Sequence, residues 1–183
     1  MQLPLQQQFD QGFSDSQALL QSFKQSLALL GEQQLEAFEQ EQDIYQLILE
    51  RSEALDALLR YAWQFFFPGS QALSLVAVGG FGRQELLPHS DIDLLILGSE
   101  QSLEQHEQKL KDFITFLWDS RLNIGHSVRT VAETIEFAKQ DITVVTNLME
   151  SRHIIGDPTL HQSLLPEITP EKISGNNQYD ESF

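Results

Sequence analysis

The stretch "VAVGGFGRQELLPHSDIDLLIL", Val76 to Leu97, decides the fold. Two apolar runs flank a loop that holds three glycines, one arginine, one proline and one histidine. The period of the two runs predicts two strands joined by this loop. The second strand opens with Asp91 and Asp93, and a buried carboxylate is unfavourable unless a positive group meets it. The pair therefore indicates a bound cation, which identifies the loop as a candidate functional site.

Outward from this stretch, the apolar pattern predicts several helices and a few strands. We expect helices over residues 14–30, 32–42, 43–66, 102–120, 131–140 and 141–154, and strands over 73–78, 91–97 and 122–130. Within 141–154, residues 143–146 leave a strand open as the local alternative. Gly31 is expected to stop the first helix. The first ten residues read as a frayed terminus, and the chain beyond Gly156 reads as turn-rich. This order of elements predicts an α+β or α/β fold with a small sheet.

Composition narrows the classes of partner. The chain has 183 residues, a formal net charge of −16 and no cysteine. A surface this acidic repels nucleic-acid backbones and anionic membranes. We therefore expect neither nucleic acid nor a membrane as a partner. Disulfides and cysteine-ligated zinc are excluded. No signal peptide and no bilayer-spanning run is recognisable in the sequence, so we expect a cytoplasmic protein.

Glycines after a strand suggest three phosphate-binding devices. The P-loop requires a lysine after its last glycine, and none is near. The dinucleotide fingerprint G-x-G-x-x-G is half matched by Gly80 and Gly82, but Glu85 stands at its third glycine. The third device is a glycine pair that ends one strand, followed about ten residues later by D-x-D at the start of the next. Its spacing matches this chain.

Asp91 and Asp93 are two positions apart, so in a strand they project from the same face, with Cα atoms roughly 6.5–7 Å apart. Such carboxylates suit Mg²⁺, which usually completes its coordination with waters and substrate phosphates. Gly79 and Gly80 allow a triphosphate to approach the backbone closely. Arg83 can neutralise phosphate charge. The alternatives are a pair of exposed turn acids, a simple tight turn, and a surface pair of Arg83 with Glu85.

Three motifs in order, "AVGGFGRQELLPHSDIDLLIL", "IGHSVRT" and "DITVVTNLMESRHIIGD", resemble the amino-terminal transferase domain of the bacterial PII uridylyltransferase/uridylyl-removing enzymes. These belong to the DNA polymerase β-type nucleotidyltransferase superfamily. The resemblance implies an α+β fold with a small mixed sheet and amino-terminal helices packed on it. The resemblance covers roughly Leu47 to Asp157. We expect the chain to divide into a helical region (1–68), a nucleotidyltransferase domain (69–160) and an irregular or disordered tail (161–183).

The same resemblance implies transfer of UMP from UTP to a tyrosine of the PII nitrogen-signalling protein, with release of pyrophosphate. Mg²⁺ is the expected ion and Mn²⁺ the alternative. Asp91 and Asp93 would be the catalytic, metal-holding residues. The nucleotide would meet Gly79, Gly80, Arg83 and Ser90.

This superfamily generally adds a third carboxylate from a neighbouring strand, and here the sequence departs from it. "RLNIGHSVRT" contains no acid. Asp141 or Glu150 is the candidate third acid, and Asp141 is equally expected to cap a helix. Arg129 and Arg152 are candidates for phosphate binding or for structural pairing.

The full-length enzymes of this family also carry a His-Asp phosphohydrolase domain and ACT domains. The chain has no His-Asp dipeptide, so we expect it to represent the amino-terminal portion, without the uridylyl-removing activity. Three functions stay open: a uridylyltransferase domain, a nucleotidyltransferase with another acceptor or nucleotide, and a catalytically silent nucleotide-binding fragment.

Overall fold

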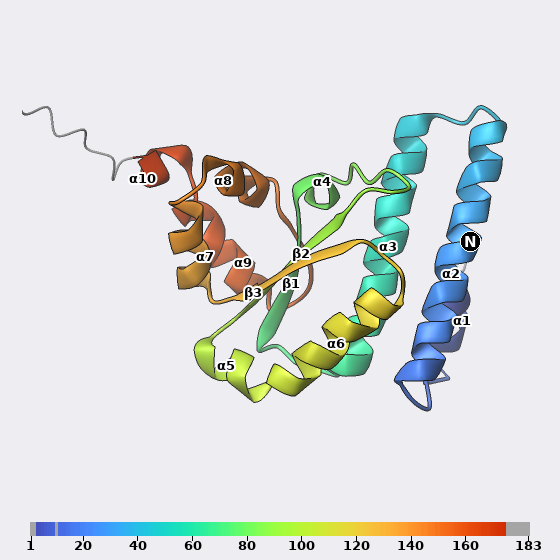
Figure 1. Ribbon diagram of the computed structural model, residues 1–183, viewed down its shortest axis with the longest axis horizontal. Coiled ribbons are helices and arrows are strands. Elements are labelled where there is room, and N and C mark those ends of the chain that lie inside the picture. Colours follow the sequence, from blue (N-terminus) through green and yellow to red (C-terminus); the bar gives the residue numbers. More distant parts are fainter. Residues whose placement is uncertain (1–2, 10, 175–183) are drawn as a thin grey trace, which may run out of the picture.

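A four-stranded mixed sheet lies at the centre of the computed structural model, which describes residues 3–9 and 11–174 (Figure 1). The strands are β1 (Leu73–Val78), β2 (Ile92–Gly98), β3 (Ile124–Arg129) and β4 (Arg152–Gly156), in the order β3-β2-β1-β4. β1 is antiparallel to both β2 and β4, whereas β2 and β3 are parallel. The expected α+β fold with a small mixed sheet is confirmed.

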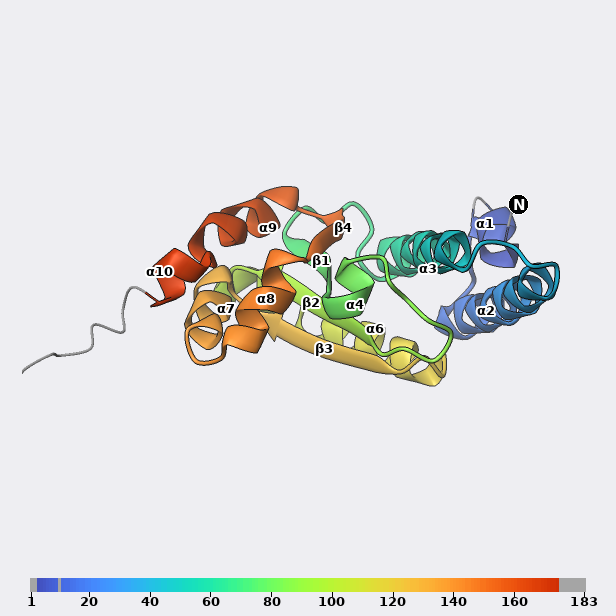
Figure 2. The ribbon, with the colours of Figure 1, turned by 90° about the horizontal axis from the view of Figure 1, so that it is seen from above.

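Helices surround this sheet. They are α1 (Pro4–Phe9), α2 (Ser16–Glu39), α3 (Ile44–Phe66), α4 (Gly79–Gly82), α5 (Glu100–Gln105), α6 (Glu107–Asp119), α7 (Val131–Ala138), α8 (Ile142–Met149), α9 (Pro158–Leu164) and α10 (Pro170–Ser174), with a 3₁₀ turn at Leu165–Glu167. From above, the hairpin α2–α3 lies at one end of the molecule and α7 to α10 at the other (Figure 2).

The sheet buries a different apolar cluster on each face. One face carries Leu75, Ala77, Ile92 and Leu94 and packs with side chains of α2, α3 and α6. The other face carries Val76, Leu95 and Leu97 and packs with side chains of α7, α8 and α9. Because strand side chains alternate between faces, Asp93 belongs to the second face, on the side of α7 to α9.

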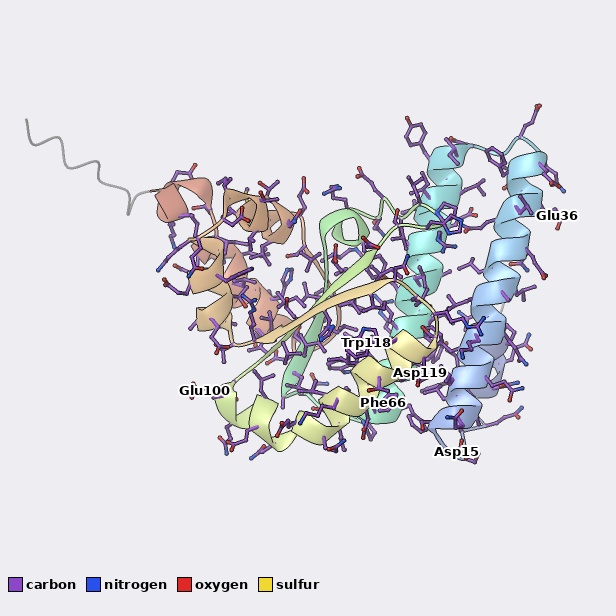
Figure 3. All side chains as sticks on the ribbon, viewed as in Figure 1. Asp15, Glu36, Phe66, Glu100, Trp118 and Asp119 are labelled. Carbon is purple, nitrogen blue, oxygen red and sulfur yellow. The ribbon has the colours of Figure 1, made fainter. Side chains whose placement is uncertain are left out.

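Polar side chains define where several helices begin. Asp15, at the start of α2 (Figure 3), accepts a hydrogen bond from the Ala18 N–H. Thr130 and Glu133 form a reciprocal capping box at the start of α7. Each such cap stabilises its helix by about 1 kcal/mol. The capping residue of α2 is thus Asp15, so the helix begins at Ser16, two positions after the predicted start at residue 14.

The first helix is longer than its pattern predicts. Gly31 does not end it, because α2 continues to Glu39. A glycine inside a helix costs about 1 kcal/mol relative to alanine, which the packing of α2 against α3 can outweigh. Gly31 has a φ outside the left-handed region, so the conformation that would make it a helix stop is absent.

The region after α7 also differs from expectation. The predicted helix 141–154 ends at Met149, and Arg152–Gly156 forms the edge strand β4. The antiparallel pairing of β4 with β1 overrides the local helical pattern.

Two segments expected to be irregular are helical. Residues 4–9 form α1, in which Leu5 is fully buried and its N–H donates to Ser26 Oγ. Residues after Gly156 form α9 and α10 as far as Ser174. Residues 175–183, at the end of the expected tail 161–183, lie outside the described residues.

No helix within residues 3–9 and 11–174 is long and apolar enough to cross a bilayer.

A buried histidine predicts a pH-dependent stability. His161 on α9 is 6% exposed and its ring nitrogen lies 2.8 Å from Ser151 Oγ. Burial, and then the charge of His153, lower the pKa of His161 below its usual value. The unfolded chain therefore binds the proton more tightly, and stability is lost as the pH falls through about 6.5, the ordinary histidine pKa.

We expect urea titrations of the parent chain to give a lower free energy of unfolding at pH 5 than at pH 7. His161→Gln should make this dependence shallower. An identical pH dependence in the variant would contradict the assignment.

Candidate active site

The glycine turn and the aspartate pair meet at one end of the β1–β2 ladder. Val78, the last residue of β1, pairs with Asp93. Gly79 follows with a φ of 59°, a left-handed conformation that side chains disfavour. A Cβ built on Gly79 would lie 3.4 Å from Asp93 Oδ2, so the carboxylate sits directly against the glycine. Residues that the sequence separates by a loop are therefore neighbours in space.

Asp91 and Asp93 share one surface. Both are exposed, and both line a depression of about 480 Å³ that also includes Asn123 and Gly125. Ile92 and Leu94 are buried in the core of the opposite face. The two carboxylates can thus approach one ligand without disturbing the core.

Two effects make Asp93 unusual among the acids. Although the residue is exposed overall, its carboxylate lies against Gly79 and Gly125 and is partly desolvated; this desolvation, and then the negative charge of Asp91, raise the pKa of Asp93 above its usual value. Both effects disfavour the ionised carboxylate in the folded protein. A cation between the two aspartates would relieve this destabilisation, and the oxygen donors fit Mg²⁺, for which one or two carboxylates plus substrate phosphates are the usual ligands.

A third carboxylate does not join the pair. Within the described part of the chain, no three His, Cys, Asp or Glu side chains lie together as a possible metal site. Asp141 accepts a hydrogen bond from the Thr143 N–H and caps α8, which is the alternative that the sequence also suggests. Glu150 accepts a hydrogen bond from Arg83 at 2.7 Å. Both candidates for the third acid are thus engaged elsewhere.

The strand β3 supplies neighbours that sequence reasoning missed. Gly125 pairs with Asp93, and a Cβ built on Gly125 would lie 2.3 Å from Asp93 Oδ1. The absence of a side chain at Gly125 therefore makes room for the Asp93 carboxylate. Asn123, two residues earlier, also lines this depression. The strand "RLNIGHSVRT" contains both residues, but only the parallel register of β3 with β2 shows that they lie beside the aspartates.

The loop residues take defined positions. Arg83 Nε donates to Glu85 at 2.8 Å and its guanidinium also binds Glu150, so the surface pair with Glu85 is present. About a third of the Arg83 side chain remains exposed. Ser90 Oγ accepts a hydrogen bond from the Leu87 N–H and closes the turn before Asp91. Gly80 lies in α4, close to the Arg83 side chain.

Arg152 holds the glycine turn in place through hydrogen bonds to its backbone carbonyls. Its guanidinium forms an ion pair with the buried Asp56 of α3. It also donates to the carbonyl of Phe81 at 3.0 Å and to that of Gly82 at 3.3 Å. Arg152 therefore joins α3, β4 and the carboxyl end of α4. The sequence leaves both phosphate binding and structural pairing open for Arg152, and the structure shows structural pairing.

Several known proteins are similar in sequence to this chain. The sequence profile of the nucleotidyltransferase domain matches residues 59–154. Bifunctional uridylyltransferase/uridylyl-removing enzymes of Aliivibrio fischeri and Vibrio cholerae are each 46% identical over 152 residues, 82% of this chain and 17% of theirs. The enzyme of the same name from Pseudomonas putida is 46% identical over 167 residues, 88% of this chain and 18% of its own. The chain thus spans less than a fifth of the length of these relatives.

The glycine turn predicts two contrasting alanine variants. A Cβ on Gly82 would lie 2.6 Å from the Glu150 carbonyl oxygen and 3.0 Å from that of Ala77, both backbone atoms. Gly82→Ala should therefore lower the free energy of unfolding by about 1–3 kcal/mol. Gly80→Ala is the matched control, because its Cβ would make ordinary contacts at 3.7 and 3.8 Å. It should stay within about 0.5 kcal/mol of the parent in the same urea titrations. Equal destabilisation of both variants would contradict this packing.

The raised pKa of Asp93 predicts that a neutral side chain is better tolerated there. The folded protein holds the Asp93 proton more tightly than the unfolded chain does. The ionised carboxylate therefore destabilises the metal-free fold once the pH exceeds about 3.9, the ordinary aspartate pKa. Asp93→Asn should raise the melting temperature in EDTA at pH 7, and this gain should shrink as the pH is lowered toward 3.9. A lower melting temperature of Asp93→Asn at pH 7 would be the contrary result.

Proposed function

This chain belongs to the nucleotidyltransferase domain family, and on that premise we propose that it transfers UMP from UTP to a tyrosine of the PII nitrogen-regulatory protein. The reaction takes place in the cytoplasm and depends on Mg²⁺, for which Mn²⁺ is the alternative. One observation carries the proposal: the Asp93 carboxylate lies against Gly79, with Asp91 on the same surface.

The choice of uridylyl transfer is supported by the relatives. Those that match 82–88% of this chain are named uridylyltransferases, and the matched region includes the glycine turn and both aspartates. PII as the acceptor follows from the resemblance of the three sequence motifs to that family. The geometry is compatible with this acceptor because the aspartates are exposed, so a tyrosine of another protein can reach them.

Each residue of the site has a separate task in the proposed reaction. Asp91 and Asp93 would hold the divalent ion. When bound, the ion offsets charge on the phosphates and lowers the pKa of the attacking hydroxyl. Gly79 and Gly80 leave the backbone open to the triphosphate, and the backbone N–H groups of such a turn can donate to phosphate oxygens.

Arg83 can donate to the leaving phosphates in exchange for Glu85 or Glu150. The tyrosine hydroxyl gives its proton to solvent, its oxygen forms a bond to the α-phosphorus while the bond to the bridging oxygen breaks, and pyrophosphate leaves.

A silent nucleotide-binding fragment is the second candidate. It is favoured by one observation, that no third carboxylate accompanies Asp91 and Asp93 within the described residues. Transfer to another acceptor or from another nucleotide is the third.

Incubation of the chain with PII, Mg²⁺ and UTP labelled at the α-phosphate tests the proposal. We expect the label on a PII tyrosine. Asp93→Asn should lower the transfer rate by roughly 100-fold or more, because metal binding contributes several kcal/mol to such reactions. Arg83→Ala should chiefly raise the KM for UTP.

The matched control is Asp119→Asn, which removes one exposed carboxylate from the end of α6 (Figure 3) and should leave the rate unchanged. Label from ATP, or label on another acceptor, would replace the proposal by the broader nucleotidyltransferase activity. Binding of UTP without transfer would favour the silent fragment. Full activity of Asp93→Asn would remove the basis of the proposal.

A further inference from the structure

A second cavity adjoins the aspartate pair on the α7–α8 side of the sheet. It has a volume of about 250 Å³ and is lined by Asp93, Gly125, Ser127 and Arg129 from the strands, Phe137 from α7 and Asn147 from α8, among others. Gly125 and Arg129 are four positions apart on β3, a distance of roughly 13 Å between Cα atoms. Asp93 therefore marks one end of the cavity and Arg129 the other.

Arg129 is a half-buried cation that forms no ion pair within 4.0 Å among the described residues, although its charge acts on the nearby Glu133. The nearby Glu133 accepts hydrogen bonds from the N–H and the hydroxyl of Thr130. In a chain of net charge −16, acidic partners are plentiful, and both Arg83 and Arg152 have them. Arg129 thus differs from the other two arginines close to the site.

An aromatic ring orients the guanidinium of Arg129. Its central carbon lies 3.8 Å from the centroid of the Phe137 ring. Stacking on an aromatic face leaves the N–H groups, which lie in the guanidinium plane, free to donate sideways. The group is therefore held ready to donate hydrogen bonds to an acceptor in the cavity.

Asn147 adds a second unpaired polar group. It is half-buried, and its side-chain amide has no hydrogen-bond partner among the described residues. By contrast, the hydroxyl of Thr134, in the same cavity, donates to the Thr130 carbonyl. An arginine can only donate, whereas an asparagine amide both donates and accepts. Together they complement a ligand edge that carries a carbonyl oxygen beside an N–H group.

We propose that this cavity holds the nucleoside part of the substrate and that Arg129 determines its base specificity. This inference rests on the proposed function, which places the triphosphate at Asp93. At about 250 Å³ the cavity is smaller than the roughly 300–1,000 Å³ of pockets that enclose a whole ligand, so it suits a base and its sugar. Arg129 donates to the base carbonyl and Asn147 accepts from the adjacent N–H.

This pairing distinguishes uracil from cytosine. A thymine-type ring presents an acceptor oxygen where cytosine presents an amino group, and uracil shares that oxygen. A fixed arginine donor therefore attracts UTP and repels the amino group of CTP.

Calorimetric titration of the 183-residue chain with UTP, CTP and uridine, in Mg²⁺, tests the assignment. The parent should prefer UTP over CTP, and Arg129→Ala should reduce the ratio of the two Kd values by roughly 10-fold or more. The same variant should weaken the binding of uridine, which has no phosphate. Lys24→Ala, which removes one positive charge on α2 at the far end of the molecule, should leave the ratio unchanged.

Arg129→Gln provides a second variant that retains a side chain of similar polarity. Its amide can accept from cytosine as well as donate to uracil, so the preference should again decrease. Thermal melts confirm that each variant is folded. An unchanged ratio with an equal loss of affinity for UTP and CTP would overturn the inference, because it would assign Arg129 to the phosphates.

The failures of the two proposals can be told apart. A parent chain that binds no triphosphate would overturn both. If the parent binds UTP tightly and Arg129→Ala discriminates against CTP as strongly as the parent does, only the specificity assignment is overturned. A loss of base discrimination in Arg129→Ala, without any transfer to PII by the parent, would support the specificity assignment and overturn the proposed acceptor.

Discussion

The register of the β1–β2 ladder is the constraint on which the rest of the site depends. Because Val78 pairs with Asp93, the turn that follows β1 begins beside the residue that opens β2. The left-handed Gly79 turns the chain at this point, and the Asp93 carboxylate occupies the space that a side chain there would take. A slip of one residue would turn Asp93 into the core and Ile92 toward the surface. The burial of Ile92 and Leu94 therefore orients the carboxylates.

The helices keep this turn in place from the opposite side of the sheet. Asp56 on α3 is buried and binds Arg152, which in turn holds the carbonyls of Phe81 and Gly82. A buried ion pair is weak evidence for stability, because desolvation offsets much of its attraction. The additional hydrogen bonds from Arg152 to the backbone indicate that this pair positions the glycine turn. Through Arg152, α3 is connected to the glycine turn, although no residue of α3 lines the depression around Asp91.

Local patterns in the sequence predicted the elements whose partners lie nearby. The glycine pair, the D-x-D spacing and the strands 73–78 and 91–97 depend on backbone period and turn chemistry, which act over a few residues. The same reasoning was wrong for 141–154, where β4 forms because β1 offers an unpaired edge. It was wrong for Gly31 because the packing of α2 against α3 continues beyond it. In both places a contact distant in sequence outweighs a local preference.

What the sequence by itself determined is that two carboxylates share a strand face next to a glycine turn, since side chains two residues apart always project together. Only the tertiary structure decided which other groups accompany them. It set Gly125 and Asn123 beside the aspartates, assigned Glu150 to Arg83 and Arg152 to Asp56, and stacked Arg129 on Phe137 with no ion pair to a described carboxylate. In the sequence alone, the three arginines Arg83, Arg129 and Arg152 cannot be told apart by role. Their roles differ because a charged group takes the partner that packing brings within hydrogen-bond distance.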